Sequence, residues 1–112
     1  MALQRISRER LEIFVPSGTP LGDITLYEAI FTEARRLGLA GATITRCNLG
    51  YGPENRVRGK ATLVPANEVP VKIEIIDTPE KLDLMLPFLE KNLKNGIAVR
   101  GTVDILAPAE MI

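Results

Sequence analysis

The sequence predicts an α+β fold of the ferredoxin-like type, a four-stranded antiparallel sheet with two helices on one face. Four segments alternate apolar and polar residues with the period of a strand, and two segments repeat apolar residues at the spacing of a helix. These segments follow one another in the order β-α-β-β-α-β, which is the split βαβ pattern.

The first strand is predicted to end at Pro16, where a Pro-Ser-Gly sequence begins a turn. Leu11, Ile13 and Val15 alternate with polar or aromatic neighbours, so these three residues share one face of the strand. Residues 1–9 contain charges and only scattered apolar side chains, and we expect them to form a flexible leader.

The first helix is predicted to begin after Thr25, because Glu28 three residues later gives the spacing of a capping box. Gly38 can adopt the left-handed conformation that ends a helix, which leaves a helix of about three to four turns. The residues predicted to face the core are Leu26, Ile30, Ala34 and Leu37.

Two more strands are predicted at residues 42–49 and 71–77, and we expect them to pair with each other. Both contain many β-branched residues at a period of two. Between them, Gly50-Tyr51-Gly52-Pro53 cannot continue a central strand, and the chain is then polar and basic as far as Lys60. Residues 50–65 are therefore predicted to form a long connecting loop.

The second helix is predicted to begin with Thr78 as its N-cap and Pro79 in its first turn, where no amide donor is needed. Pro87 removes one backbone hydrogen bond and is expected to bend the helix, which Asn95-Gly96 then ends. The apolar stripe of this helix comprises Leu82, Met85, Leu86, Leu89 and Leu93.

The last strand is predicted at residues 97–106, and residues 107–112 are expected to be a loosely held tail. No shift in composition divides the chain. Residues 1–112 are therefore predicted to form a single domain of ordinary length, with its core at residues 10–106.

The composition excludes several classes of function. The 112 residues include no His, which removes histidine triads and most zinc sites, and we expect no cofactor. Fourteen basic and fourteen acidic residues leave no net charge, so no nucleic-acid partner is expected. Cys47 is the one cysteine, and no segment resembles a signal peptide or a membrane span, which predicts a cytoplasmic protein.

The sheet face away from the helices is predicted to be a mixed polar surface. The side chains expected there are Arg10, Glu12, Thr45, Lys72 and Glu74, together with Phe14 and Ile76. Isolated apolar groups among charges that can pair are typical of a contact between subunits. A solvent-exposed sheet face is the alternative that the pattern leaves open.

Several separated segments resemble the PII signal-transduction proteins. Residues 41–46 and the Gly50-Tyr51-Gly52 turn are similar to the second PII strand and the start of its T-loop, and residues 71–75 are similar to the next strand. The segments that more closely resemble the PII-like branch named domain of unknown function one hundred and ninety are 26–30, 39–43, the Gly-Tyr-Gly turn, 70–78 and 86–87. The resemblance covers about residues 10–106 in register.

The resemblance implies a homotrimer in which three sheets face inward and ligand clefts lie between subunits, near the base of the T-loop. In PII proteins these clefts hold adenine nucleotides, and the loop changes conformation to engage a transporter, channel or enzyme. This chain departs from PII proteins at residues 95–102, where only Arg100 and Gly101 compare with the phosphate-binding loop, and it lacks the arginine pair after the last strand. Tyr51 lies in the Gly-Tyr-Gly turn rather than at a loop tip.

Glycine-containing turns supply five of the candidate ligand-binding residues. Gly50, Tyr51 and Gly52 would let a backbone approach a ligand, although glycines at this spacing also suit an ordinary turn. Arg100 and Gly101 offer a cation and a pliable backbone between helix and strand, where an ordinary connection with a surface arginine is the alternative.

Three cations of the loop complete the candidate site. Arg56, Arg58 and Lys60 alternate, so in an extended loop they share one side and could hold phosphates. A solvated loop is the alternative, because alternating charge commonly serves solubility. Cys47 is expected to be structural, since no His or second Cys stands ready to activate it.

The residues and the resemblance together predict a PII-like regulatory protein rather than an enzyme. We expect a small anionic metabolite, with an adenine nucleotide as the first candidate, to bind between subunits and to order the loop at 50–65. The alternative is an adaptor trimer without a ligand that docks on a membrane transporter or channel. An enzyme is not expected, because the sequence pairs no nucleophile with a base.

Overall fold

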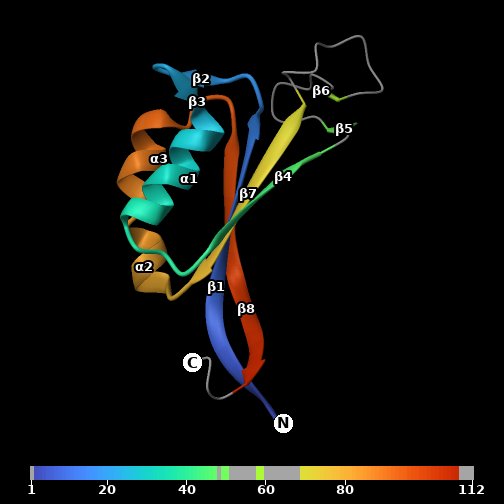
Figure 1. The fold of residues 1–112 in the computed structure, drawn as a ribbon, viewed down its shortest axis with the longest axis vertical. Coiled ribbons are helices and arrows are strands. Elements are labelled where there is room, and N and C mark those ends of the chain that lie inside the picture. Colours follow the sequence, from blue (N-terminus) through green and yellow to red (C-terminus); the bar gives the residue numbers. More distant parts are fainter. Residues whose placement is uncertain (1, 48, 51–57, 60–68, 109–112) are drawn as a thin grey trace.

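The computed structural model describes residues 2–47, 49–50, 58–59 and 69–108. Figure 1 shows a twisted sheet with the helices on one face. Its strands are antiparallel and lie in the order β4-β7-β1-β8, so the predicted fold class and the predicted pairing of the second and third strands are confirmed. These strands are β1 (Leu3–Pro16), β4 (Ala42–Arg46), β7 (Pro70–Asp77) and β8 (Ile97–Pro108).

Shorter elements complete the fold. The helices are α1 (Leu26–Arg36), α2 (Pro79–Asp83) and α3 (Leu86–Asn92). Two pairs of two-residue strands are β2 (Pro20–Leu21) with β3 (Ile24–Thr25), and β5 (Leu49–Gly50) with β6 (Arg58–Gly59).

The caps of α1 are those that the sequence predicts. The Thr25 hydroxyl accepts a hydrogen bond from the Glu28 amide at 3.3 Å and donates one to the Glu28 carboxylate at 2.7 Å. Gly38 follows the last turn with a φ of 75°, which glycine adopts without the steric cost of a side chain. Both ends of α1 are therefore fixed by local sequence.

The second predicted helix is broken rather than bent, so the prediction of one continuous helix is wrong. Pro87 has no amide to bond to the carbonyl of Asp83 four residues earlier, and the chain makes a turn between α2 and α3. Leu86, expected in the buried stripe, is instead 36% exposed. The stripe residues that are buried are Leu82, Met85 and Leu89.

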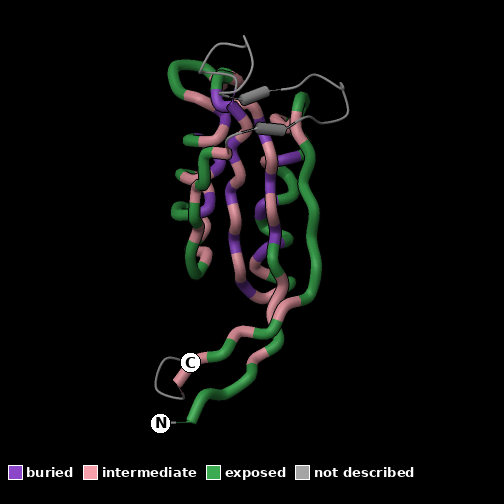
Figure 2. Tube along the Cα trace, turned by 90° about the vertical axis from the view of Figure 1, so that its right-hand side faces the viewer, coloured by how far each residue is buried: buried purple, intermediate pink, exposed green. Residues whose placement is uncertain are grey.

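The hydrophobic core lies between the helices and the sheet. Every second residue enters it along β1 from Leu11 onward and along β7 from Val71 to Ile75, as the period of two predicts, and Figure 2 shows buried positions alternating along strands. Ile13 lies opposite Ile73 in the register of the two strands. The core residues of the two strands, each at most 3% exposed, are Leu11, Ile13, Val15, Val71, Ile73 and Ile75.

Beyond this core, β1 and β8 continue as a two-stranded extension. Residues 3–8 pair with residues 103–108, whereas the pairing of β1 with β7 begins only at Glu9. We call residues 3–8 and 103–108 the arm, and Figures 1 and 2 show it projecting past the helices. The expectation of a leader free of regular structure is therefore wrong from Leu3 onward, because backbone pairing with β8 holds this polar segment in a strand.

Gly96 fixes the start of β8 against the end of β1. A Cβ at this position would lie 2.7 Å from Cγ1 of Val15 and would also collide with the carbonyl oxygen of Phe14. Because one of the obstructing atoms belongs to the backbone, a side chain here forces the two strands apart. The helical segment ends at Asn92, earlier than the predicted end at Asn95-Gly96, and Gly96 instead stands directly before β8.

Candidate functional site

The chain leaves β4 and enters β7 at the same end of the sheet. The Cys47 amide donates a hydrogen bond to the Pro70 carbonyl at 2.8 Å, and the Ser17 amide donates one to the Val69 carbonyl at 2.9 Å. The segments that enter and leave the connection therefore lie beside the end of β1. In Figure 1, β5 and β6 are drawn beyond the ends of β4 and β7.

Two of the predicted ligand-binding residues are neighbours across β5 and β6. Gly50 lies opposite Arg58, and Leu49 lies opposite Gly59, in an antiparallel pair. The backbone thus brings together one residue from the glycine turn and one from the basic segment. Predictions for Tyr51, Gly52, Arg56 and Lys60 fall outside the described residues.

Ser17 is a polar residue at this end of the sheet that the sequence reasoning treated only as part of a turn. It is 5% exposed, and its Oγ has no hydrogen-bond partner among the described residues. A buried hydroxyl without a partner is costly, so such a group commonly has a further role. Nothing in a Pro-Ser-Gly turn distinguishes this serine, since only the fold buries it.

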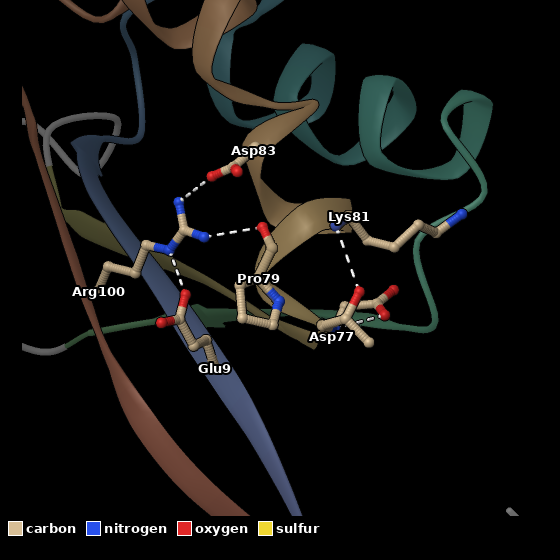
Figure 3. Close-up of polar contacts among 7 residues, drawn as sticks. Glu9, Asp77, Pro79, Lys81, Asp83 and Arg100 are labelled. Carbon is tan, nitrogen blue, oxygen red and sulfur yellow. Dashed lines mark hydrogen bonds and ion pairs between the residues drawn. The ribbon is translucent and has the colours of Figure 1, made fainter.

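Arg100 lies within β8 rather than between helix and strand, so its predicted placement is wrong. Its Nε donates to Glu9 at 2.6 Å, its Nη1 donates to Asp83 at 2.7 Å, and its Nη2 donates to the Pro79 carbonyl at 2.8 Å (Figure 3). The hydrogen bond to Asp83, with that to Glu9, raises the pKa of the Arg100 guanidinium above its ordinary value. Arg100 therefore ties β8 and β1 to α2.

The predicted site residues are not all together within one chain. Arg100 lies opposite Leu11 in the register, five residues along β1 from Pro16, which is roughly 17 Å at the ordinary rise of a strand. Gly101 lies opposite Arg10 on the other face of the sheet, where an added Cβ would meet open space. Arg100 and Gly101 thus lie on opposite faces of the sheet, and neither is paired with Gly50 or Arg58.

Asp77 is a second buried polar residue that the sequence patterns do not single out. Its side chain accepts from the Ala40 amide at 2.8 Å and from the Thr78 amide at 2.7 Å, and the residue is only 8% exposed. These bonds join the chain after α1 to the start of α2, beside the cluster of Arg100 (Figure 3). The signal was present in the sequence, because Asp77 continues the inward-facing alternation of β7.

The open face of the sheet carries the mixed charges that the sequence predicts. Arg10 Nε lies 3.5 Å from Glu12 and 3.9 Å from Glu74, and Lys72 Nζ lies 3.7 Å from Glu12. Glu12 and Glu74 face each other across β1 and β7, so the two cations offset the repulsion between the carboxylates. This cluster is internally paired and neutral.

The part of the chain that the structure describes lacks both a metal-ligating cluster and a helix of membrane-spanning length. No group of three or more His, Cys, Asp or Glu residues there could hold a metal ion. No helix among those residues is long and apolar enough to cross a membrane.

Comparison with known proteins identifies relatives over nearly the whole chain. The family model DUF190, described as Uncharacterized ACR, COG1993, matches residues 8–105. A UPF0166 protein of Aquifex aeolicus is 28% identical over 101 residues, which cover 90% of this chain and 95% of the relative. A UPF0166 protein of Methanocaldococcus jannaschii is 32% identical over 95 residues, which cover 81% and 83%.

Solved structures share the fold. A PII-like protein of Thermus thermophilus superposes with a TM-score of 0.65 at 22% identity, over 90% of this chain and 91% of the other. A nitrogen regulatory PII-like protein of Thiomonas intermedia, bound to ADP, AMP and bicarbonate, has a TM-score of 0.63 at 17% identity, over 93% and 92%. The chain therefore belongs to the DUF190 family and has a PII-like fold.

Proposed function

We propose that this protein is a PII-like regulator that binds an adenine nucleotide between the subunits of a homotrimer and signals through residues 50–65. The observation that carries the proposal is the pairing of Gly50 with Arg58 in the connection between β4 and β7. A protein of the same fold from Thiomonas intermedia binds ADP and AMP, which supports the choice of ligand class.

The separation of the predicted residues favours a site between subunits. A nucleotide needs cations and backbone donors from several directions, and one chain places Gly101 far along β8 from the Gly50 and Arg58 pair. A neighbouring subunit can supply the opposite wall of a cleft. The neutral, mixed open face is suited to contact with another subunit.

The phosphates are assigned to the loop cations in this proposal. Arg56, Arg58 and Lys60 supply three positive charges within five residues, and guanidinium groups bind phosphate oxygens in pairs. Neutralising these charges would favour one conformation of the 50–65 loop over others. Arg100 is assigned to the fold instead, because phosphate binding would have to displace its contacts with Glu9 and Asp83.

The regulator is proposed to act by binding and without catalysis. A switch of this kind needs a ligand that binds one loop conformation better than another, and it needs no chemical step. The sequence contains no His to act as a general base at neutral pH. Turnover of a nucleotide that a single substitution abolishes would contradict this part of the proposal.

Calorimetric titration with ATP, ADP, AMP and cyclic nucleotides tests the proposal, on protein whose assembly mass has been measured. We expect saturable binding near one site per chain. Arg58→Ala should lower the affinity about tenfold or more, because it removes a charge-assisted hydrogen bond to the ligand. Arg35→Ala, which removes a cation from the last turn of α1, is the matched control and should bind like the unaltered protein.

Two results would contradict the proposal. Equal affinity of the Arg58→Ala variant would remove Arg58 from the site. Absence of heat across the whole panel, from protein of confirmed trimeric mass, would instead favour an adaptor trimer that docks on a membrane transporter or channel without a nucleotide.

A further inference from the structure

The short connection between α3 and β8 contains an asparagine followed by a glycine. Helix α3 ends at Asn92 and β8 begins at Ile97, so Asn95 and Gly96 lie between them (Figure 1). Of the asparagines in the chain, Asn95 alone precedes a glycine. Glycine has no Cβ, so its own amide nitrogen is open to approach from the preceding side chain. The pair therefore places a nucleophilic nitrogen next to an amide carbonyl.

The structure leaves this pair unrestrained. Asn95 is exposed and lies in a bend outside the helices and strands. The hydrogen bonds among the described residues include none that involves the Asn95 side chain or the Gly96 amide. A connection that no helix or strand ladder holds can turn more freely than the elements it joins. The Gly96 nitrogen can therefore reach Cγ of Asn95.

Asn92 is the natural comparison, because the fold holds it in place. Its Nδ2 donates a hydrogen bond to the Phe88 carbonyl at 2.9 Å. The amide that would attack it belongs to Leu93, and this amide already donates to the Leu89 carbonyl at 2.8 Å. The side chain of Asn92 and the amide that follows it are thus both engaged, whereas those at Asn95 are not.

We propose that Asn95 is a site of spontaneous covalent modification in the folded protein, through a cyclic imide formed with Gly96. The Gly96 amide nitrogen attacks Cγ of Asn95 and forms a new N–Cγ bond. The Cγ–Nδ2 bond breaks, and Nδ2 leaves as ammonia together with the proton from the Gly96 amide. Such a modification changes both charge and covalent structure without a catalyst.

Water then opens the imide at one of its carbonyl carbons. The hydroxyl group of the water adds to that carbon, and its remaining proton returns to the Gly96 nitrogen. Attack at Cγ breaks the new bond and leaves an ordinary aspartate. Attack at the main-chain carbonyl carbon breaks the original peptide bond, so that the chain runs through Cβ and Cγ as an isoaspartate. Both products gain a negative charge, and the isoaspartate also lengthens the main chain by one carbon.

The lengthened chain enters a junction that has no spare room. A Cβ on Gly96 would lie 2.7 Å from Cγ1 of Val15 and 3.0 Å from Cδ1 of Leu93, and it would collide with the Phe14 carbonyl oxygen. The next residue, Ile97, begins the pairing of β8 with β1 opposite Phe14. An extra main-chain carbon before Gly96 therefore strains this contact or separates the first pair of the two strands.

The same glycine creates both the reactivity and the sensitivity. Its close approach to β1 excludes a side chain, so the residue that follows Asn95 offers no steric protection. The modification thus makes the attachment of β8 to β1 weaken with the age of the molecule. It proceeds within one chain and consumes only water, so it is independent of the nucleotide and of the trimer in the proposed function.

Peptide mapping of the folded protein during incubation at mildly alkaline pH tests the proposal. Trypsin cleaves after Lys91, Lys94 and Arg100, so Asn92 and Asn95 fall in different peptides of one digest. We expect the Asn95 peptide to gain the mass of an amide exchanged for a hydroxyl as incubation proceeds, while the Asn92 peptide keeps its mass. An isoaspartate methyltransferase should label the incubated protein. Asn95→Gln, whose longer side chain disfavours the imide, should remove most of that labelling.

Thermal unfolding of the modified protein tests the structural consequence. Ion exchange isolates the modified chains, aspartate and isoaspartate together, by their added negative charge. Their melting curve should contain a component with a Tm about 4–8 °C below that of the unmodified protein. Freshly prepared Asn95→Asp is the matched control, because it carries the charge on a chain of ordinary length at an exposed position, and it should lack this component.

Three results would overturn the proposal. An unchanged mass of the Asn95 peptide from the folded protein would show that the fold protects this residue, whether or not the urea-unfolded chain gains mass. Equal gains at Asn92 and Asn95 would show that the bend confers no selectivity. A modified fraction that contains isoaspartate and melts like the unmodified protein would show that the junction of β1 and β8 accommodates the longer chain.

Discussion

Two strands flank β1 and use the same period of two in opposite senses. In β7 the apolar residues Val71, Ile73 and Ile75 face the helices and are completely buried. In β8 the apolar residues Ile97, Val99, Val103 and Ile105 face away from the helices, whereas Ala98 and Leu106 share the helix side with polar groups that include Arg100. The difference shows that burial within the chain explains the sequence of β7, whereas the chain itself leaves apolar residues of β8 such as Ile97 and Val99 exposed.

The largest expected effect contrasts one residue from each strand. Ile73→Ala should lower the free energy of unfolding by about 2–5 kcal/mol, because it leaves a cavity at a fully buried position. Val99→Ala should lower it by less than about 1 kcal/mol in the dissociated chain, since that side chain is 43% exposed there. Urea unfolding at several chain concentrations measures both.

Concentration dependence sharpens the same comparison. The loss from Ile73→Ala should be similar at every concentration, whereas the loss from Val99→Ala should grow as assembly becomes complete. Losses of equal size and equal concentration dependence would mean that the two strands do not differ in the way proposed.

The next effect concerns how β8 is attached to β1. Gly96→Ala should cost about 1–3 kcal/mol, because the new Cβ would collide with the Phe14 carbonyl and force the strands apart. Gly101→Ala, within β8, is the matched control and should stay within about 0.5 kcal/mol, since its Cβ would meet open space. Thermal unfolding of the two variants measures both effects. Equal losses of stability would contradict the close approach of Gly96 to β1.

A smaller effect is expected on the helix side of β8. Arg100→Ala should lower the free energy of unfolding by about 1–2 kcal/mol, because it removes hydrogen bonds to Glu9, Asp83 and the Pro79 carbonyl at a side chain that is 26% exposed. Arg5→Ala breaks an ion pair with Asp104 between exposed side chains and should change stability by less than about 0.5 kcal/mol.

A double-mutant cycle between Arg100 and Asp83 separates this contact from general loss of packing. Coupling near zero would show that Arg100 does not tie β8 to α2. The nucleotide affinity of the Arg100→Ala variant is a second readout. A large loss of affinity with little change in the free energy of unfolding would show that Arg100 belongs to the ligand site.

The smallest effect lies on α1, away from both strands. The hydrogen bond from Arg36 lowers the pKa of the Glu33 carboxyl. A carboxyl whose pKa is lower in the folded chain adds stability above its unfolded pKa, and that stability is lost as pH falls through the folded pKa. In the Glu33→Gln variant, the free energy of unfolding should therefore fall slightly less as the pH is lowered from neutral to the folded pKa of Glu33.

An NMR titration of the Glu33 carboxyl measures this directly, with Arg36→Gln as the paired variant that should bring the pKa back toward its ordinary value. An unchanged pKa in that variant would show that the contact in α1 has no energetic effect.

Much of the fold could be predicted because its determinants are local. The period of two located β1 and β7, Thr25 and Thr78 located the helix starts, and side-chain caps form at both residues. The capping hydroxyls each bond an amide three residues later, so a short stretch of sequence contains the whole interaction.

The rest depends on partners that are distant in the sequence. Arg100 bonds Glu9 across 91 positions and Asp83 across 17, so its place in the fold could not be seen in its neighbours. Pairing with β8 likewise gives the polar residues before Glu9 their strand conformation. Whether Pro87 bends or breaks a helix depends on how the turn before it packs, and here Met85 is fully buried in that turn.

The candidate site was only partly predictable for the same reason. Gly50 and Arg58 are candidate ligand-binding residues from the sequence alone, and the structure pairs their backbones across β5 and β6, which no pattern in the sequence predicts. Ser17 and Asp77 acquire their importance from burial, which the tertiary fold imposes.

Native mass spectrometry of the intact protein with ADP or AMP tests trimer formation and nucleotide binding together, because one spectrum counts both chains and bound nucleotides. We expect an assembly of three chains that takes up to three nucleotides. A mass of one 12.3 kDa chain that carries no nucleotide at saturating ligand would contradict it.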